Sequence, residues 1–166
     1  RIEKESLMLD RLVNNLLASQ WKLKAVEHKI EACFPPDFPS IQADPRRIEQ
    51  VLNNLVENSI KYSQKGGLIT ISGEVDSDNK AVTVTVKDEG AGIPEEYLER
   101  IFERFYRAPN PSAAYTDGSG LGLSICKGII DRHGGQVWAE SSPGKGTSIT
   151  FSLPLNPRVV MAWVDP

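Results

Sequence analysis

Several features are missing from this chain of 166 residues, and each absence excludes a class of protein. The chain has no tract of Lys and Arg and a net charge of −3, whereas nucleic-acid binding usually needs a basic excess that displaces counterions from phosphates. It has no apolar run of the length that crosses a bilayer, and its first residues lack the blocks of a signal peptide. We therefore expect a soluble, cytoplasmic chain that contacts neither nucleic acid nor membrane, even if the full protein is membrane-anchored.

Cysteine is also scarce. The two cysteines, Cys33 and Cys126, lie far apart and outside the CxxC spacing that is typical of metal and redox motifs. We expect both to be reduced thiols in the core. The length of the chain and its 40% hydrophobic content fit one globular domain with one core.

The hydrophobic pattern predicts alternating helices and strands without an internal repeat. Helices are expected over residues 5–26, 45–63 and 121–133, with a shorter one near 94–102. Strands are expected over residues 28–34, 40–43, 68–75, 81–87, 136–140 and 147–153. Asp44 has the character of an N-cap, and Pro45 suits the first helical position because its missing N–H is not needed there. The polar segment over residues 108–116 has no periodicity and is expected to be mobile.

The helix that begins at Pro45 carries the first candidate site, VLNNLVENSIKYS. Its helical spacing predicts an apolar stripe of Ile48, Val51, Leu52, Leu55 and Val56. Asn54, Asn58 and Lys61 fall together on the flank of this stripe. Asparagine is a poor helix former, so two on one edge suggest metal or phosphate binding. A solvated helix flank explains the same pattern about as well.

The second candidate is DEGAGI, residues 88–93, at the end of an expected strand. Asp88 can accept a hydrogen bond from an exocyclic amine, and Gly90 and Gly92 have no Cβ that would keep a flat ring from the backbone. By itself, this motif is also an ordinary turn at the end of a strand.

The third candidate, TDGSGLGLS, places Gly118, Gly120 and Gly122 just before an expected helix. Leu123 stands where a dinucleotide fingerprint needs glycine, and no strand precedes the loop. Gly144-Lys145-Gly146 is not a Walker loop either. The remaining interpretation is a glycine-rich approach to a helix N-terminus, which favours an anion such as a phosphate.

In this order and spacing, the motifs resemble those of the catalytic and ATP-binding domain of sensor histidine kinases, in the GHKL superfamily that includes gyrase, the heat-shock chaperone ATPases and MutL. NLVENSIKYS resembles the N box, DEGAGI and GSGLGLS the two glycine boxes, IFERFYR the phenylalanine box, and HGGQVWAESSPGKGTSITFSLPL the closing strands. The resemblance implies the Bergerat fold, an α/β two-layer sandwich whose mixed, mostly antiparallel sheet is covered on one face by about three helices, with a flexible ATP lid. It also implies a catalytic domain over residues 1–155 and a C-terminal extension or linker over 156–166.

The resemblance further implies ATP and Mg²⁺ as ligands and assigns roles to single residues. Asn58 is implied as the metal ligand, supported by Asn54, and Asp88 as the acceptor from the adenine amino group. Arg107 is implied to lie near the γ-phosphate, so that the implied catalytic set is Asn54, Asn58, Lys61 and Arg107. The implied nucleotide contacts are Asn54, Asn58, Lys61, Tyr62, Asp88, Gly90, Gly92, Ile93, Gly118, Gly120, Leu121, Gly122, Leu123 and Thr147.

Position 54 separates branches of this superfamily. Its ATP hydrolases place a glutamate one turn before the metal asparagine as a general base, and here that residue is Asn54. Glu57 lies about 100° around the helix from Asn58, so it does not take the place of the glutamate that is missing at position 54. A histidine acceptor needs less help, because neutral imidazole is already a nucleophile, so we expect transfer of the ATP γ-phosphoryl to a histidine. Neither His28 nor His133 resembles the acceptor, which is expected on a separate dimerisation domain, and the expected downstream partner is a response regulator. A gyrase-type ATP-hydrolysing switch and an inactive nucleotide-binding module remain as alternatives.

Overall fold

A computed structural model describes residues 2–25, 27–63, 67–106 and 122–155. Its main sheet has five strands: β2 (Lys29–Cys33), β4 (Leu68–Asp76), β5 (Ala81–Lys87), β7 (Thr147–Pro154) and β6 (Gln136–Ser141). They lie in the order β2-β4-β5-β7-β6. β2 pairs with β4 in parallel, and the other neighbours are antiparallel. The sheet is therefore mixed and mostly antiparallel, as predicted.

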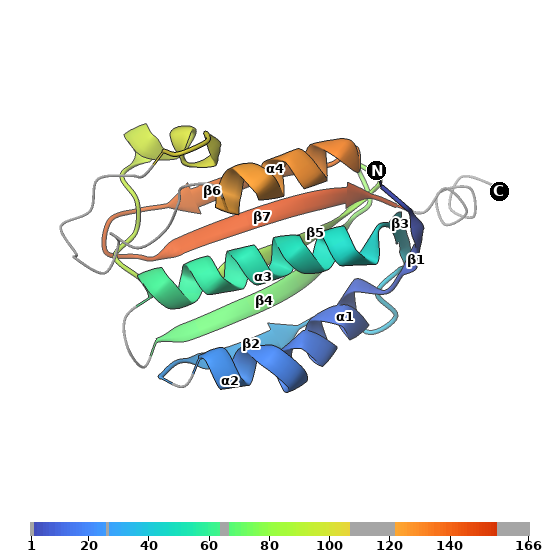
Figure 1. The fold of residues 1–166 in the computed structure, drawn as a ribbon, viewed down its shortest axis with the longest axis horizontal. Coiled ribbons are helices and arrows are strands. Elements are labelled where there is room, and N and C mark those ends of the chain that lie inside the picture. The colour runs from blue at the N-terminus through green and yellow to red at the C-terminus, as the bar shows by residue number, and fades with distance from the viewer. Residues whose placement is uncertain (1, 26, 64–66, 107–121, 156–166) are drawn as a thin grey trace.

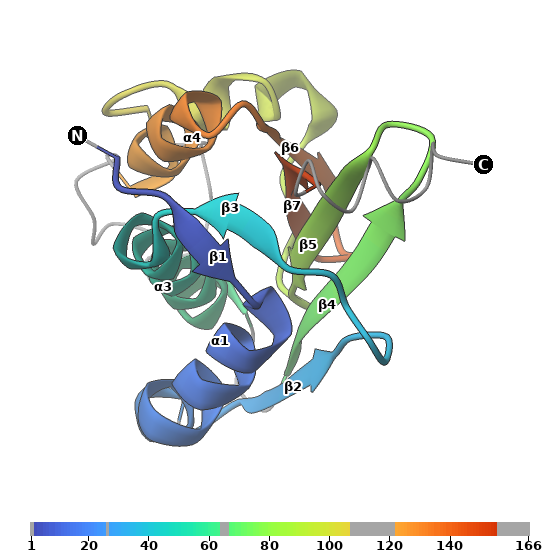
Figure 2. The ribbon, with the colours of Figure 1, turned by 90° about the vertical axis from the view of Figure 1, so that its right-hand side faces the viewer.

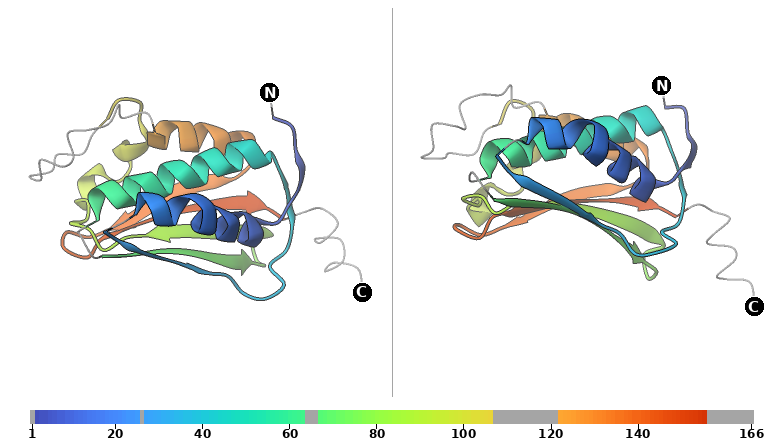
Figure 3. Two further views of the ribbon diagram at one scale, coloured as in Figure 1. Left: turned by 60° about the horizontal axis from the view of Figure 1, so that its bottom comes forward. Right: turned by 90° about the horizontal axis from the view of Figure 1, so that it is seen from below.

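The helices pack on one face of this sheet (Figure 1). The first is α1 (Leu9–Leu16), which continues through the π-helical turn η1 (Leu17–Trp21) into the single turn α2 (Lys22–Lys24). The second is α3 (Pro45–Tyr62), and the third is α4 (Gly122–Arg132). Seen along the sheet, the helices form one layer and the strands the other (Figure 3). The predicted two-layer α/β sandwich is confirmed.

The core lies between the two layers because alternate residues of each strand face the helices. In the central strands Val84 is opposite Phe151 and Val86 is opposite Ile149, and all four side chains are buried. The predicted apolar stripe of α3 is fully buried against them, at Ile48, Val51, Leu52, Leu55 and Val56. Burying a side chain of this size contributes roughly 1.5–3 kcal/mol, so α3 is held mainly by this stripe.

The N-terminus of α3 is fixed as the sequence predicts. The Asp44 carboxylate accepts from the backbone N–H groups of Arg46 and Arg47, at 3.1 and 3.4 Å, and so caps the helix. It also accepts from the N–H of Glu3 at 3.1 Å, a bond that lowers the pKa of Asp44 more than any other contact. The Asp44 N–H donates to Nε2 of the buried His133 at 3.0 Å. His133 is therefore a structural residue that joins the end of α4 to the start of α3.

The helix predicted from residue 5 is wrong at its start. Residues Glu5–Leu7 form the strand β1, which pairs antiparallel with β3 (Ile41–Ala43) in a separate two-stranded sheet. Figure 2 shows β1 lying beside β3 next to the helix layer. The helical segment that follows is buried at Leu9, Val13, Leu16 and Trp21, whereas Leu23 at its end is 76% exposed.

Other predictions need smaller corrections. The short helix expected near residues 94–102 is two 3₁₀ turns, Glu95–Tyr97 and Arg100–Phe102. Cys33 is exposed at the end of the edge strand β2, and only Cys126 lies in the core. The segment expected to be mobile, residues 108–116, lies outside the described residues. Among the described helices, none combines the length and the apolarity that a membrane span requires.

Candidate functional site

The amides of α3 lie on the flank that faces α4. Asn54 Nδ2 donates to the carbonyl oxygen of Gly122, the first residue of α4, at 3.3 Å. Asn58 lies one turn later on the same face, and both asparagines are partly buried. Lys61 is exposed near the end of α3, and Tyr62 is its last residue. The structure thus brings the predicted amides to the side of the helix where α4 begins.

The neighbouring polar residues of α3 face the other way. Asn53 accepts from Nε1 of the buried Trp21 at 2.9 Å. Glu57 forms an ion pair with Lys24 of α2 at 2.6 Å. Both side chains are thus engaged with the first helical segment, on the flank opposite α4. The prediction that Glu57 does not replace a glutamate at position 54 is consistent with this geometry.

Asp88 follows β5 directly and is only 5% exposed. Its Oδ1 accepts from the N–H groups of Gly90 at 2.9 Å and Thr147 at 3.3 Å, and its carboxylate also bonds the hydroxyl of Ser59. Burial raises the pKa of Asp88, and these three bonds oppose the rise by stabilising the charged form. The result is a carboxylate held in a fixed orientation at the edge of the core.

Three glycines allow the chain to close tightly around Asp88. A Cβ on Gly90 would lie 2.2 Å from the carbonyl oxygen of Tyr62, and one on Gly146 would lie 2.0 Å from the carbonyl oxygen of Asp88. Gly92 has a φ of +80°, and a Cβ there would lie 2.1 Å from the carbonyl oxygen of Ser142. No side chain fits at these contacts. Backbone packing by itself therefore requires the glycines of DEGAGI.

Ser141 joins the remaining segments of the site. Its hydroxyl accepts from the N–H of Ile93 at 2.6 Å and donates to the carbonyl oxygen of Gly146 at 2.8 Å. It also lies 3.0 Å from Oγ1 of Thr147. The loop after Asp88 is thus tied to the turn between β6 and β7, and this brings the predicted residues Ile93 and Thr147 together.

The remaining predicted nucleotide contacts lie at the start of α4 or outside the described residues. Gly122 is exposed at the start of α4, where a Cβ would meet nothing within 4 Å. Leu123 is partly buried and packs against the core. Arg107, Gly118, Gly120 and Leu121 lie outside the described residues, so their roles stay predictions.

Sequence reasoning missed two residues of the site, Ser59 and Ser141. Ser59 is 3% exposed and stands three and four residues after Val56 and Leu55, in the apolar stripe of α3. A hydroxyl in such a stripe needs a hydrogen-bond partner, and this is the signal that could have found it. Ser141 carries no comparable signal, because a serine at the end of a strand is common.

Residues 43–157 match the family described as histidine kinase-, DNA gyrase B- and HSP90-like ATPase. Sensor histidine kinase WalK of Bacillus subtilis is 45% identical over 114 residues, which are 69% of this chain and 19% of WalK. The adaptive-response sensory kinase SasA of a Nostoc species is 44% identical over 129 residues, 78% of this chain and 31% of SasA. The chain thus spans between a fifth and a third of the length of these relatives.

Solved structures agree with this assignment. The nucleotide-free catalytic domain of histidine kinase ThkA has a TM-score of 0.78 and 33% identity, and the match covers 94% of this chain and 98% of that domain. ThkA is also known in complex with the response regulator TrrA, where the match has a TM-score of 0.75 and 31% identity and covers 95% of this chain and 43% of ThkA. The chain therefore belongs to the histidine kinase-, gyrase B- and HSP90-like ATPase family, as a catalytic, ATP-binding domain of the sensor histidine kinase type.

Proposed function

We propose that this domain transfers the γ-phosphoryl group of Mg·ATP to a histidine on a separate dimerisation domain. The observation that carries the proposal is the polar arrangement of α3. Asn54 faces α4, and the nearby carboxylate, Glu57, is paired with Lys24 on the other flank. An amide takes no proton at neutral pH, so activation of water is disfavoured, whereas a neutral imidazole is already a nucleophile.

Asn58 is proposed as the Mg²⁺ ligand. Its amide oxygen is the kind of hard donor that Mg²⁺ prefers. In the described part of the chain, no three or more His, Cys, Asp or Glu side chains gather as a metal cluster. A single protein ligand fits Mg²⁺, which commonly takes its remaining ligands from substrate phosphates and water. When bound, the metal would neutralise phosphate charge.

The adenine end of the site is proposed to lie at Asp88. Its ionised carboxylate would accept from the adenine amino group, with Gly90, Gly92, Ile93 and Thr147 around the ring. The fixed orientation of Asp88 supports this role, because a pre-oriented acceptor loses little freedom on binding. The other residues proposed to contact the nucleotide are Asn54, Lys61, Tyr62, Arg107, Gly118, Gly120, Leu121, Gly122 and Leu123.

The proposed partners are the dimerisation domain of the same kinase, which carries the acceptor, and a response regulator. The ThkA–TrrA complex supports the second partner by similarity. The domain is proposed to end at Leu155, which is buried and whose N–H bonds the carbonyl oxygen of Lys80 at 3.0 Å. Residues 156–166 are then an extension or linker. A cytoplasmic location is proposed because ATP is the phosphoryl donor.

Two measurements on the purified chain test the function. The first is calorimetric binding of Mg·ATP by wild type and by Asp88→Asn, in which Oδ1 can still accept from Gly90 and Thr147 but the new amide nitrogen cannot accept from adenine. The second is transfer of labelled phosphate to the kinase's own dimerisation domain, supplied as a separate protein. We expect binding that Asp88→Asn weakens, and labelling of the histidine.

The alternatives predict different results. An ATP-hydrolysing switch would release phosphate without the acceptor domain at a rate comparable to transfer. An inactive module would bind nucleotide and never label the histidine. Absence of adenine-nucleotide binding by the wild type would contradict all three functions.

A further inference from the structure

Two hydroxyl groups lie together at the end of the β6–β7 pair. Ser141 is the last residue of β6 and lies directly opposite Thr147, the first residue of β7. Residues directly opposite each other in an antiparallel pair share one face of the sheet. Thr147 stands two positions before the buried Ile149, so both hydroxyls lie on the face that the helices cover. This is also the side on which the Ser59 hydroxyl of α3 bonds Asp88.

The partners of Ser141 determine how its hydroxyl group is used. A hydroxyl has one hydrogen to donate and two lone pairs that accept. The carbonyl oxygen of Gly146, 2.8 Å from Ser141 Oγ, can only accept, so it takes the hydrogen. The N–H of Ile93, at 2.6 Å, can only donate, so it occupies one lone pair. The bonding position that remains on Ser141 is therefore the second lone pair.

This second lone pair fixes the direction of the bond between the two hydroxyls. Thr147 Oγ1 lies 3.0 Å from Ser141 Oγ, and the hydrogen between them must come from Thr147, because Ser141 has already donated its own. With its single hydrogen turned toward Ser141, the Thr147 hydroxyl offers only lone pairs to any other partner. Toward a ligand, Thr147 is therefore an acceptor.

Thr147 is also held firmly beside Asp88. The Thr147 N–H donates to Asp88 Oδ1 at 3.3 Å, and the Asp88 N–H donates to the carbonyl oxygen of Thr147 at 2.9 Å. The turn that precedes β7 is tied down as well, because the N–H of Gly144 donates to the carbonyl oxygen of Ala91 at 2.7 Å. Both Thr147 and Asp88 are nearly buried, where a mismatched polar contact is costly. An ionised carboxylate and a hydroxyl oriented to accept thus belong to adjoining residues.

Adjoining acceptors select a ligand by the donors that it carries. The exocyclic amine of adenine has two N–H groups, whereas a purine with a carbonyl oxygen at the same position presents an acceptor there. We propose that Ser141 determines base specificity by holding the Thr147 hydroxyl as an acceptor, so that the site favours a purine with an amine at this position. Ser141 acts through Thr147 and is therefore a positioning residue. The inference rests on the proposed binding of adenine at Asp88.

A comparison of Mg·ATP with Mg·ITP tests this role, because inosine triphosphate (ITP) has a carbonyl in place of the amine. In Ser141→Ala the Thr147 hydroxyl is released and can turn to donate to that carbonyl. The preference for ATP, measured as the Kd of ITP divided by the Kd of ATP, is therefore expected to fall about three- to tenfold, the effect of one hydrogen bond. Ser141→Thr keeps a hydroxyl and should retain the preference. Calorimetric titration of the purified chain measures both constants.

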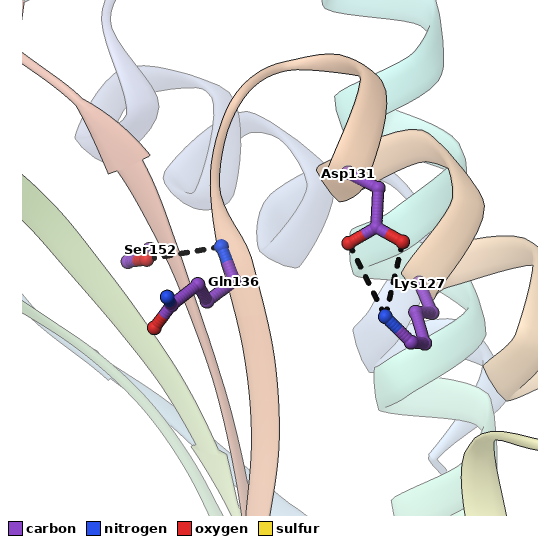
Figure 4. Close-up of polar contacts among 4 residues, drawn as sticks. All are labelled: Lys127, Asp131, Gln136 and Ser152. Carbon is purple, nitrogen blue, oxygen red and sulfur yellow. Dashed lines mark hydrogen bonds and ion pairs between the residues drawn. The ribbon is translucent and has the colours of Figure 1, made fainter.

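The matched control is Ser152→Ala, at the other end of the same strand pair (Figure 4). The Ser152 hydroxyl accepts from the N–H of Gln136 at 3.2 Å, so this variant also removes a serine hydroxyl that bonds a backbone N–H. It should leave the ratio of the two constants unchanged. If Ser141→Ala weakens the binding of ATP and ITP by the same factor, Ser141 only stabilises the loops, and the proposal is overturned. Circular dichroism would verify that each variant is folded.

A second variant keeps the proposal testable if Ser141→Ala does not fold. Thr147→Val retains the branched shape and removes the hydroxyl, so it should also lower the preference for ATP, and Ser141→Ala should then change the ratio no further. An unchanged ratio in Thr147→Val would contradict the proposal. Absence of Mg·ATP binding by the wild type would contradict the proposed function and this inference with it, whereas binding with a ratio that none of these variants alters would contradict only the role of Ser141.

Discussion

Ser59 of α3 bonds the carboxylate of Asp88, which lies at the end of β5. Both residues are nearly inaccessible to solvent. Because Ser59 directly follows Asn58, this contact joins the helix that carries the proposed metal ligand to the proposed adenine acceptor. Burial raises the pKa of Asp88 and the Ser59 hydroxyl opposes that rise, so Ser59 favours the ionised form at which an amine can donate.

Ser59→Ala is expected to shift the pH dependence of nucleotide binding. Loss of the hydroxyl raises the pKa of Asp88 further, so on acidification the affinity for Mg·ATP falls at a higher pH than in wild type. The stability cost is about 1 kcal/mol. Binding titrations across a pH series measure the midpoint. The control is Thr85→Val, which removes the 2.8 Å bond to Thr150 and leaves the midpoint in place. An unchanged midpoint in Ser59→Ala would count against the role of Ser59.

Asp88 also affects stability in a defined direction. Folding raises its pKa from the ordinary value of 3.8. Between pH 3.8 and the folded pKa, the folded chain therefore retains a proton that the unfolded chain has lost. As the pH rises from 3.8 through the folded pKa, this residue therefore makes the folded state progressively less stable. In Asp88→Asn this pH dependence is absent, and chemical denaturation at several pH values would detect the difference from wild type.

Three glycine-to-alanine substitutions should change the free energy of unfolding in opposite directions. Gly90→Ala and Gly146→Ala introduce overlaps with carbonyl oxygens, and Gly146 also has a φ of +79°. Each should cost about 2 kcal/mol or more of unfolding free energy and weaken nucleotide binding. Gly128 lies inside α4, where Gly128→Ala meets open space and should instead stabilise the chain by ~1 kcal/mol. Urea unfolding of the three variants measures these differences, and destabilisation by Gly128→Ala would contradict the geometry described for α4.

Substitutions at two adjacent residues of α3 should differ sharply in their effect on Mg·ATP binding. Asn58→Ala removes the proposed metal ligand and is expected to weaken Mg·ATP binding about tenfold or more. Glu57→Ala is the matched control, because it removes only a solvent-exposed ion pair with Lys24, worth ~0–1 kcal/mol. Calorimetry with and without Mg²⁺ separates the two. Equal losses in both variants would contradict the assignment of Asn58.

The two thiols should react at very different rates. Burial raises the pKa of the Cys126 thiol to about 12, so almost none of it is thiolate at neutral pH, whereas Cys33 is exposed. A thiol reagent such as Ellman's reagent is expected to modify one cysteine in the folded chain and two after denaturation. Cys33→Ser should abolish the native reaction. Rapid native modification of Cys126 would indicate that the core between α3 and α4 opens.

The sequence was sufficient where the signal is local. Asp44 and Pro45 predict the start of α3, because a helix cap involves only the next two or three residues. Strands β4 and β5, expected over residues 68–75 and 81–87, follow from the alternation of apolar and polar residues along each strand. The resemblance supplied the site residues, and the arrangement of Asn54, Asn58 and Asp88 in the structure is consistent with it.

The errors arise where a distant partner decides the conformation. Glu5–Leu7 continues an apolar pattern that suits a helix, but pairing with Ile41–Ala43 makes it a strand. The error at Cys33 is of another kind: Cys33 shares the exposed face of β2 with Lys29 and Glu31, so the alternation of this strand already places it outside the core. Ser59 has a role only because Asp88, 29 positions later, folds against it. Short-range periodicity contains none of these contacts.

The antiparallel pairing of β1 with β3 has a mechanical consequence. The Glu3 N–H donates to the Asp44 carboxylate, and Glu5–Leu7 pairs with the strand that leads directly into α3. A pull on this N-terminal segment along its own axis would load the ladder in shear, and the tension would reach the helix through Asp44. The N-terminal segment is therefore attached to the helix that carries Asn54 and Asn58 at that helix's own cap.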